Sequence, residues 1–482
     1  MKRVLLSLLI VMFTVIAASS QDTAPAPGAP RSVVVPVVKE KKLANGLTVV
    51  VMEKRSSPLV TAQLLIKSGA NAEDMKKAGL ANTTADMLTK GTKTRTATQI
   101  AESMEFLGGS IGTATGWNNS TVTATFTSDK LDKAMAIMAD VVLNPSFKQS
   151  EIDLVKTQAL DGLTFNLKQP GFLANYVASR YSYNEHPVNG TPRSITSLSR
   201  EDMAEFHKYY YSPVNAVLIF TGDITQIKAN ALAQQYFGRW KSSGFEKDHK
   251  AISSDKPLGR QVLRRILVID LPDAGQAAVK YLKEGLDITR GSAEYYRASV
   301  LNSLLGGGYS SRLNQEIRIK RGLSYGAGSS FAWRGWKNNF STTTQTKNES
   351  AAEVAELVVG EIKKLGDKSA GDPELGPRKL VLTGAFGSAL ETTGGMAGIL
   401  NELYTFDLPL TNLNTYMSGV RGVSSSQIRD FAYQNFRNGD IIIVGNAAAF
   451  MDDLKKRFPE MPIETIKAAD LDVGTVSLRK ED

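Results

Sequence analysis

An internal repeat limits the folds open to this chain more than any other feature of the sequence. Residues 199–224 read SREDMAEFHKYYYSPVNAVLIFTGDI, and residues 424–447 read SSSQIRDFAYQNFRNGDIIIVGNA. Each copy starts with a serine that can cap a helix, reaches a phenylalanine and ends in an apolar strand closed by glycine, Gly222 or Gly445. The copies are separated by roughly half of the 482 residues, so the sequence predicts two homologous domains.

The order of the expected elements indicates the fold class. Strands are expected at Leu47–Met52 and Leu59–Lys67, a helix at Ala78–Leu88, and a hairpin from Ser110 to Thr127 around the turn Trp117-Asn118-Asn119. Helices and hairpins in mixed order predict an α+β protein, with a mainly antiparallel sheet and packed helices in each domain. The expected divisions are a signal peptide at 1–20, a Pro/Ala-rich leader at 21–36, an N-terminal domain at 37–242, a linker at 243–260 and a C-terminal domain at 261–475.

The N-terminus carries an export signal. Lys2 and Arg3 precede an apolar run from Val4 to Ala18, and small residues follow before Gln21. This pattern is typical of a cleavable signal peptide and predicts a periplasmic protein, although a retained membrane anchor is the alternative. The chain contains no cysteine, so it has no thiolate metal site and no disulfide.

The charge pattern argues against nucleic-acid binding. The formal net charge of +9 is spread thinly along the chain. The longest basic run, RIKR at 318–321, has no flanking aromatic ladder on which bases could stack. We therefore expect neither a nucleic-acid partner nor a membrane partner after signal removal.

The stretch from Gly306 to Phe331 reads GGGYSSRLNQEIRIKRGLSYGAGSSF and is the strongest candidate for a substrate site. An apolar helix at 298–305 runs into three glycines, and a second short helix carries Arg318 and is broken by Gly322. The following segment alternates small and large residues as a strand does, with Tyr325 near its start. A guanidinium and a phenol on either side of a glycine turn can both donate hydrogen bonds to a peptide carbonyl or a developing oxyanion. The alternative is a surface arginine and a half-buried strand tyrosine.

The phrase GLANTTADMLTKGT at 79–92 makes the chain resemble the pitrilysin/insulinase-type zinc peptidases, family M16, of the mitochondrial-processing-peptidase-like branch. The resemblance implies a LuxS/MPP-like metallohydrolase fold and places the family's inverted zinc motif, His-x-x-Glu-His, on this helix. In this chain those three positions hold Asn82, Ala85 and Asp86. An amide and a carboxylate are poor zinc ligands compared with imidazoles, and no general base stands between them.

No other residues offer a replacement for the zinc motif. The family's further metal-binding glutamate would fall within 158–170, where Gly162 stands near the expected place with only Asp161 beside it. The histidines His186, His207 and His249 are never spaced as a pair on one helix face, and we expect them to be ordinary loop or surface residues. The sequence therefore predicts that this chain binds no metal and is inactive alone.

The second domain follows the family pattern closely. Arg318 and Tyr325 match the family's Arg/Tyr pair, which reaches the zinc site of the other domain and helps to hold substrate. The resemblance implies a non-metal-binding subunit that supplies this pair in trans to a zinc-bearing paralogous subunit, acting on short or unfolded peptides. The rival readings are a proteolytically inactive peptide-binding scaffold and a homodimeric structural module.

Overall fold

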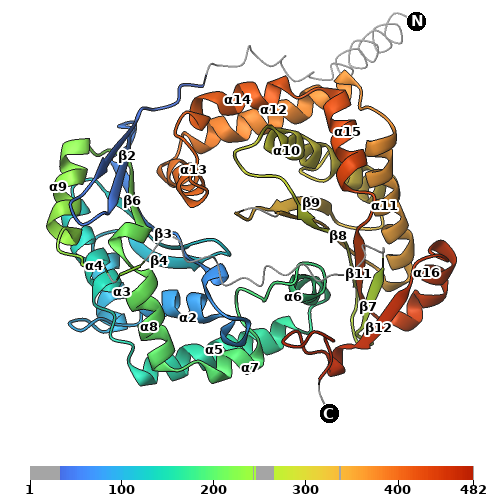
Figure 1. Ribbon diagram of the computed structural model, residues 1–482, viewed down its shortest axis with the longest axis horizontal. Helices are drawn as coiled ribbons and strands as arrows, with labels where there is room; N and C mark the ends of the chain where they lie inside the picture. The colour runs from blue at the N-terminus through green and yellow to red at the C-terminus, as the bar shows by residue number, and fades with distance from the viewer. Residues whose placement is uncertain (1–32, 243, 246–264, 336–337, 481–482) are drawn as a thin grey trace, which may run out of the picture. The chain divides into compact units, whose positions relative to one another are not determined.

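The computed structural model describes residues 33–242, 244–245, 265–335 and 338–480 (Figure 1). The predicted signal peptide at 1–20 and most of the predicted leader and linker lie outside these described residues. Val35–Asp482 forms one compact unit that contains both sheets. Within the described part of the chain, none of the helices combines the length and the apolar character needed to cross a membrane.

Each half of the chain builds one six-stranded sheet. The first has the strand order β1-β2-β6-β3-β5-β4 and the second has the order β12-β7-β11-β8-β10-β9. The strands of the first sheet are β1 (Val38–Lys42), β2 (Thr48–Glu53), β3 (Leu59–Ile66), β4 (Ser110–Thr115), β5 (Ser120–Thr127) and β6 (Ala216–Gly222). Those of the second are β7 (Ile266–Asp270), β8 (Ala277–Leu286), β9 (Ala327–Ala332), β10 (Asn338–Thr346), β11 (Asp440–Gly445) and β12 (Ile463–Lys467).

The two sheets are copies of one pattern. In both, the first long strand pairs in parallel with the glycine-closed strand, β2 with β6 and β7 with β11. All other neighbours except β7 and β12 run antiparallel. The sixth strand differs, because β1 comes from the start of its half and β12 from the end of the chain. The predicted α+β class with two homologous, mainly antiparallel domains is confirmed.

The helices also repeat. In the first half they are α2 (Leu80–Leu88), α3 (Ala97–Phe106), α4 (Leu131–Leu143), α5 (Gln149–Asn166), α6 (Pro170–Tyr181), α7 (Pro192–Ser197), α8 (Arg200–Tyr210) and α9 (Gln226–Phe237). In the second they are α10 (Ala293–Leu305), a π-helix η4 (Asn314–Ile319), α11 (Ala351–Asp367), α12 (Asp372–Ala389), α13 (Thr393–Thr405), α14 (Asn412–Gly422), α15 (Ser425–Asn435) and α16 (Met451–Arg457). Helix α10 begins earlier in the chain than the expected apolar segment at 298–305.

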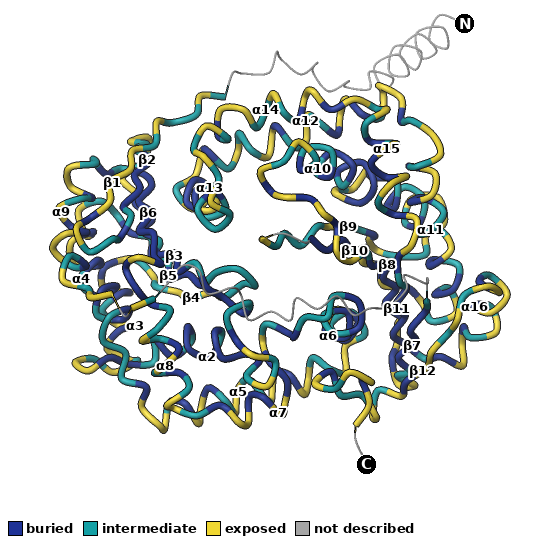
Figure 2. The backbone as a smooth tube through the Cα atoms, viewed as in Figure 1, coloured by how far each residue is buried: buried dark blue, intermediate teal, exposed yellow. Residues whose placement is uncertain are grey.

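Local chemistry explains why the repeated segments fold alike. Ser199 and Ser424 both form capping boxes, in which the serine oxygen accepts from the backbone N–H of the third helical residue, and that residue's side-chain oxygen accepts from the serine N–H. The phenylalanines seven residues on, Phe206 and Phe431, are both buried in the core of their half. Each then contributes the apolar stabilisation of a buried aromatic, on the order of 1.5–3 kcal/mol. The central strands appear as continuous buried segments in Figure 2.

A helix from each half packs on the sheet of the other half. Helix α13 contacts β3 and β6, and helix α6 contacts β8 and β11. The apolar side chains Leu173 and Val177 of α6 join one cluster with Ile442 and Val444 of β11. The two halves are therefore cross-braced, and neither sheet has both faces covered by its own half.

Polar groups at the two crossings occupy equivalent places. Gln63 pairs in register with Ile219 of β6, bonds to Thr123 Oγ1 at 2.8 Å and accepts from Asn401 of α13 at 3.0 Å. Lys280 occupies the same register position opposite Ile442 of β11. Its Nζ donates to Thr343 Oγ1 at 2.8 Å and to Asn175 Oδ1 of α6 at 2.7 Å. One crossing thus uses a neutral amide where the other buries a lysine.

Candidate functional site

Helix α2 carries the positions of the family's zinc motif, and its polar groups bond to each other. Asn82 and Asp86 lie one turn apart on a partly exposed face, and Asn82 Nδ2 donates to Asp86 Oδ2 at 3.1 Å. Burial raises the pKa of Asp86, while Lys90, Thr113 and Asn82 act in the opposite direction. Ala85, between them, is buried at 1% exposure and offers no donor atom.

These residues do not fit zinc. An amide and a carboxylate already joined by a hydrogen bond provide neither the imidazoles nor the general base of such a site. The other expected contributor is absent too, since Asp161 and Gly162 are exposed on α5. Among the described residues, no group of three or more His, Cys, Asp or Glu side chains is arranged to hold a metal ion.

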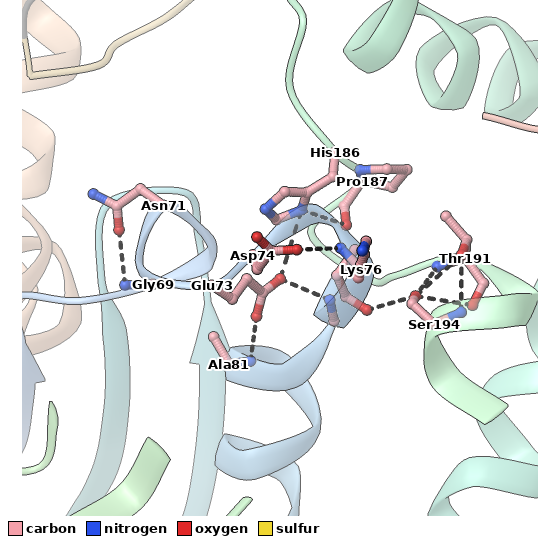
Figure 3. Close-up of polar contacts among 12 residues, drawn as sticks. Gly69, Asn71, Glu73, Asp74, Lys76, Ala81, His186, Pro187, Thr191 and Ser194 are labelled. Carbon is pink, nitrogen blue, oxygen red and sulfur yellow. Dashed lines mark hydrogen bonds and ion pairs between the residues drawn. The ribbon is translucent and has the colours of Figure 1, made fainter. Parts of the chain in front are cut away.

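The N-terminus of α2 is fixed by a buried glutamate instead (Figure 3). Glu73 accepts from the backbone N–H of Gly79 at 2.7 Å and of Ala81 at 2.5 Å, and its side chain is fully buried. Burial raises the pKa of Glu73 to about 8, although the helix N–H groups favour its charged form. Nδ1 of His186 lies 3.6 Å from the Glu73 carboxylate, and burial lowers the pKa of His186. Sequence reasoning missed Glu73; the signal was the acidic pair Glu73-Asp74 a few residues ahead of the helix-starting glycine.

The histidines are more buried than expected. His186 is 7% exposed and lies 5.1 Å from the ring of Trp117, centroid to centroid. The Nε2 atom of His207 is 2.8 Å from the carbonyl oxygen of Val142, and burial lowers the pKa of His207 to about 4. His186 lies in a loop as expected but is buried there, and His207 lies half-buried on α8. His249 lies outside the described residues.

In the second half, a tight glycine turn leads from α10 to the arginine-bearing helix. A side chain on Gly306 would meet the backbone nitrogen of Ser329 at 2.4 Å, and one on Gly307 would meet Cα of Ser303 at 2.7 Å. Glycine is needed at both places, because the loop passes directly against β9 and α10. The loop's position is thus set by backbone packing.

Arg318 lies on a short helix as expected, and this helix is a π-helix. The segment Asn314–Ile319 has the wide turn of a π-helix, and the N–H of Lys320 bonds to the carbonyl of Gln315. Such turns are rare and occur often at functional sites. The guanidinium carbon of Arg318 lies 5.0 Å from the ring centroid of Tyr309. In the described part of the chain, no carboxylate lies within salt-bridge distance of Arg318.

Tyr325 stands in a loop and not in a strand. Strand β9 begins at Ala327, and Ser324 closes a turn before it by bonding to both the N–H and the carbonyl of Gly326. The side chain of Tyr325 is 89% exposed, and the expected strand position and the half-buried alternative are both wrong. The turn is preceded by Gly322, which ends the helix with φ +65° as expected. Among the described residues, no hydrogen bond or ring contact joins Arg318 to Tyr325.

The fold and the two segments define a class of protein: two sheets of six strands with packed helices, in which the described residues hold no group of donors arranged for a metal ion. Sequence models of the family agree. The insulinase (peptidase family M16) model matches residues 48–170, and the peptidase M16 inactive domain model matches residues 197–374. The chain belongs to peptidase family M16.

Relatives from several bacteria support this assignment. An uncharacterized zinc protease of Rickettsia felis is 27% identical over 335 residues, which are 68% of this chain and 78% of the relative. The uncharacterized zinc protease YmxG of Bacillus subtilis is 24% identical over 365 residues, covering 74% of this chain and 85% of the relative.

Solved structures share the fold. A peptidase M16 inactive domain from Pseudomonas fluorescens superposes with a TM-score of 0.74 at 25% identity, over 85% of this chain and 98% of its own. A protease from Helicobacter pylori gives 0.78 at 21% identity, over 85% and 99% of the two chains. The periplasmic protease PqqL from Escherichia coli gives 0.71 at 13% identity, over 90% of this chain and 52% of its own.

Proposed function

We propose that this chain is the non-metal-binding subunit of a secreted zinc peptidase complex. Its partner is a zinc-bearing subunit of the same family, and its substrates are short or unfolded peptides. The proposed compartment is the periplasm. The basic and apolar N-terminal sequence supports that proposal, as does the fold shared with a periplasmic protease.

One observation carries this proposal. Arg318 has no carboxylate partner in the described part of the chain and Tyr325 is 89% exposed, whereas Asn82 and Asp86 are bonded to each other. Hydrogen-bond donors without internal partners remain available for a substrate. The metal-side positions, in contrast, are already occupied by an internal bond.

The proposed division of labour follows from these groups. The partner contributes the zinc ion and the general base that activate water for attack on a peptide carbonyl. Arg318 and Tyr325 donate N–H and O–H groups to the substrate oxygen, which fixes the peptide's orientation and stabilises negative charge as it develops. Both donors precede the edge strand β9, so they are anchored to a sheet rather than to a long free loop.

Two substitutions test the proposal in the complex. Tyr325→Phe removes one exposed hydroxyl, and Arg318→Ala removes the guanidinium. Loss of one preorganised donor typically lowers turnover by on the order of 10²–10³. We expect unchanged complex formation and a fall of this size in peptide cleavage, mainly in kcat.

Tyr433→Phe is the matched control, because Tyr433 is a half-exposed tyrosine that contacts a different arginine, Arg437, at 3.3 Å from its ring centroid. It should leave cleavage unchanged. If Arg318→Ala and Tyr325→Phe both cleave at the parental rate in an intact complex, the role in trans is wrong. A peptide-binding scaffold would then be the better account.

A further inference from the structure

We propose that Arg318 and Tyr309 form a carboxylate-reading subsite, which gives the complex a preference for peptides with an acidic group beside the bond to be cleaved. Tyr309 is the positioning residue, since it acts through Arg318. This inference rests on the proposed function and adds to it the chemistry of the preferred substrate.

The loop that carries Tyr309 is braced by α12 and by the π-helix η4. Arg378 of α12 donates to the hydroxyl of Ser310 at 2.7 Å, and Asn314 contacts the carbonyl of Gly308 at 3.4 Å. Arg378 is itself buried, at 8% exposure. Tyr309 therefore extends from a fixed backbone, although its own side chain is 61% exposed.

The ring of Tyr309 lies where it can orient the guanidinium. The 5.0 Å separation between the Arg318 guanidinium carbon and the ring centroid is within the range of cation–π contacts. Arg318 is partly exposed, and a partly exposed arginine otherwise samples several rotamers, so that ordering it costs conformational entropy when a ligand binds. A ring that already holds the planar group reduces this cost.

The charge balance of the segment singles out Arg318. Every other cation from 312 to 321 has a carboxylate partner; the pairs are Arg312–Glu374, Lys320–Glu316, Arg321–Glu316 and Arg321–Glu353. Within the described residues, Arg318 is the cation of this segment whose charge no neighbour balances. The local field therefore favours an anion at this guanidinium.

A peptide carboxylate satisfies this geometry better than other groups of a peptide do. The guanidinium presents several N–H donors in one plane and can bind both oxygens of a carboxylate. It can therefore hold a neighbouring acidic side chain, or a chain end, in addition to the carbonyl that the proposed function assigns to it. The anionic group would lie against Arg318, and Tyr309 would flank the apolar part of the peptide.

Peptide binding to the mature chain alone tests this inference without the partner. The probes are two unstructured rhodamine-labelled decapeptides that differ only in Glu or Gln at one position, and fluorescence anisotropy measures both. We expect the Glu peptide to bind about fivefold more tightly, as an exposed charge pair allows, and the preference to shrink with added salt. Arg318→Gln should abolish the preference.

Variants of Tyr309 separate positioning from general structure. Tyr309→Leu should reduce the preference by about two- to fivefold, the size of an exposed cation–π contact, whereas Tyr309→Phe should retain it. Tyr433→Leu, which removes the ring beside Arg437, is the control and should change nothing. Thermal unfolding checks that each variant is folded.

Three outcomes would overturn the subsite: equal binding of both probes, absence of binding to either, or a preference that survives Arg318→Gln. If the preference is absent while Arg318→Ala and Tyr325→Phe still slow cleavage in the complex, only this inference fails. If the preference is present while cleavage is unaffected by those variants, the proposed function fails and the subsite stands.

Discussion

The two halves of this molecule share one fold but differ in how they treat their polar site residues. On α2 in the first half, Asn82 and Asp86 bond to each other, and Ala85 between them is buried. In the second half, Arg318 has no carboxylate partner among the described residues and Tyr325 is exposed. The comparison indicates which half can still engage a ligand: polar groups that satisfy each other are no longer available, and those left unpaired are.

The same contrast recurs where the halves cross. The neutral Gln63 and the buried Lys280 occupy equivalent register positions, and each bonds to a threonine of its own sheet and an asparagine of the other half's helix. A buried amide costs little once it is hydrogen-bonded, whereas a buried ammonium is costly without a carboxylate partner. The second half therefore carries the energetically more costly polar group at the crossing, Lys280, and, among the described residues, the unpaired polar group at the candidate site, Arg318.

Restoring the zinc motif should change the difference between the two halves more than any other substitution. Even so, we expect the restored residues not to form a functional zinc site. Asn82→His, Ala85→Glu and Asp86→His together supply two imidazoles and a base, but the acid nearest the expected place on α5 is still the exposed Asp161. Sites that lack a ligand and its supporting bonds bind metal at least 10–100-fold more weakly. We expect weak zinc binding by titration calorimetry and no cleavage.

Tight, stoichiometric zinc uptake by that triple variant would contradict the account, since it would show that Asp161 or another acid completes the site. The single change Ala85→Glu is the control, because it introduces only the base. That change places a carboxylate at a buried position, so it should lower stability without adding metal affinity.

Glu73 makes the stability of the folded chain depend on pH, and a substitution of Glu73 can separate this contribution from that of other groups. Its pKa is raised to about 8 from an unfolded value near 4.5, so between these values the folded chain binds more protons and stability falls as pH rises. The lowered pKa of His186 acts only below about 6.5, and the opposite contribution of Lys280 near pH 8 is the same in the parent chain and in a Glu73 variant, so their difference between pH 6.5 and 8 reports on Glu73. Glu73→Gln keeps an acceptor for the N–H groups of α2 and should remove this decline.

Thermal midpoints of the parent chain and Glu73→Gln at pH 6.5 and pH 8 measure the effect. The parent should lose more stability across this interval than the variant does. An equal loss in both would show that Glu73 is already ionised in the folded chain.

Lys280 should produce a smaller effect of opposite sign in the second half. Burial lowers its pKa to about 8 from 10.5, so the unfolded chain binds more protons between these values and stability rises with pH. Lys280→Gln copies the equivalent Gln63, and it should remove this rise and raise stability at neutral pH by about 1 kcal/mol. The control is Lys467→Gln, an exposed lysine on β12 of the same sheet. A rise that persists in Lys280→Gln would contradict the assignment.

The sequence predicted the fold well where local chemistry decides it. The serine caps and buried phenylalanines of the repeat set the same helix and strand twice, and Gly322 ended its helix as expected. The placement of Tyr325 failed because alternation in LSYGAGSSF mimics a strand, while Ser324 closes a turn there. The sequence did not predict that α6 and α13 each pack on the sheet of the other half, since this packing depends on contacts between residues far apart in sequence.

The features of the candidate site also divide into those that the sequence predicts and those that it does not. The loss of zinc donors at Asn82, Ala85 and Asp86 is readable from residue types alone. The bond between Asn82 and Asp86, the role of Glu73 and the contact of Tyr309 with Arg318 depend on three-dimensional placement. The roles of Arg318 and Tyr325, and the domain boundaries at 37–242 and 261–475, stay predictions.

Metal content and peptide cleavage of the purified chain without residues 1–20, alone and then mixed with the proposed zinc-bearing partner, test the central claim most directly. After dialysis at neutral pH, the account predicts far less than one zinc per chain and no cleavage by the chain alone. Zinc and cleavage should both appear when the partner is added. One zinc per chain together with cleavage by the chain alone would contradict the account.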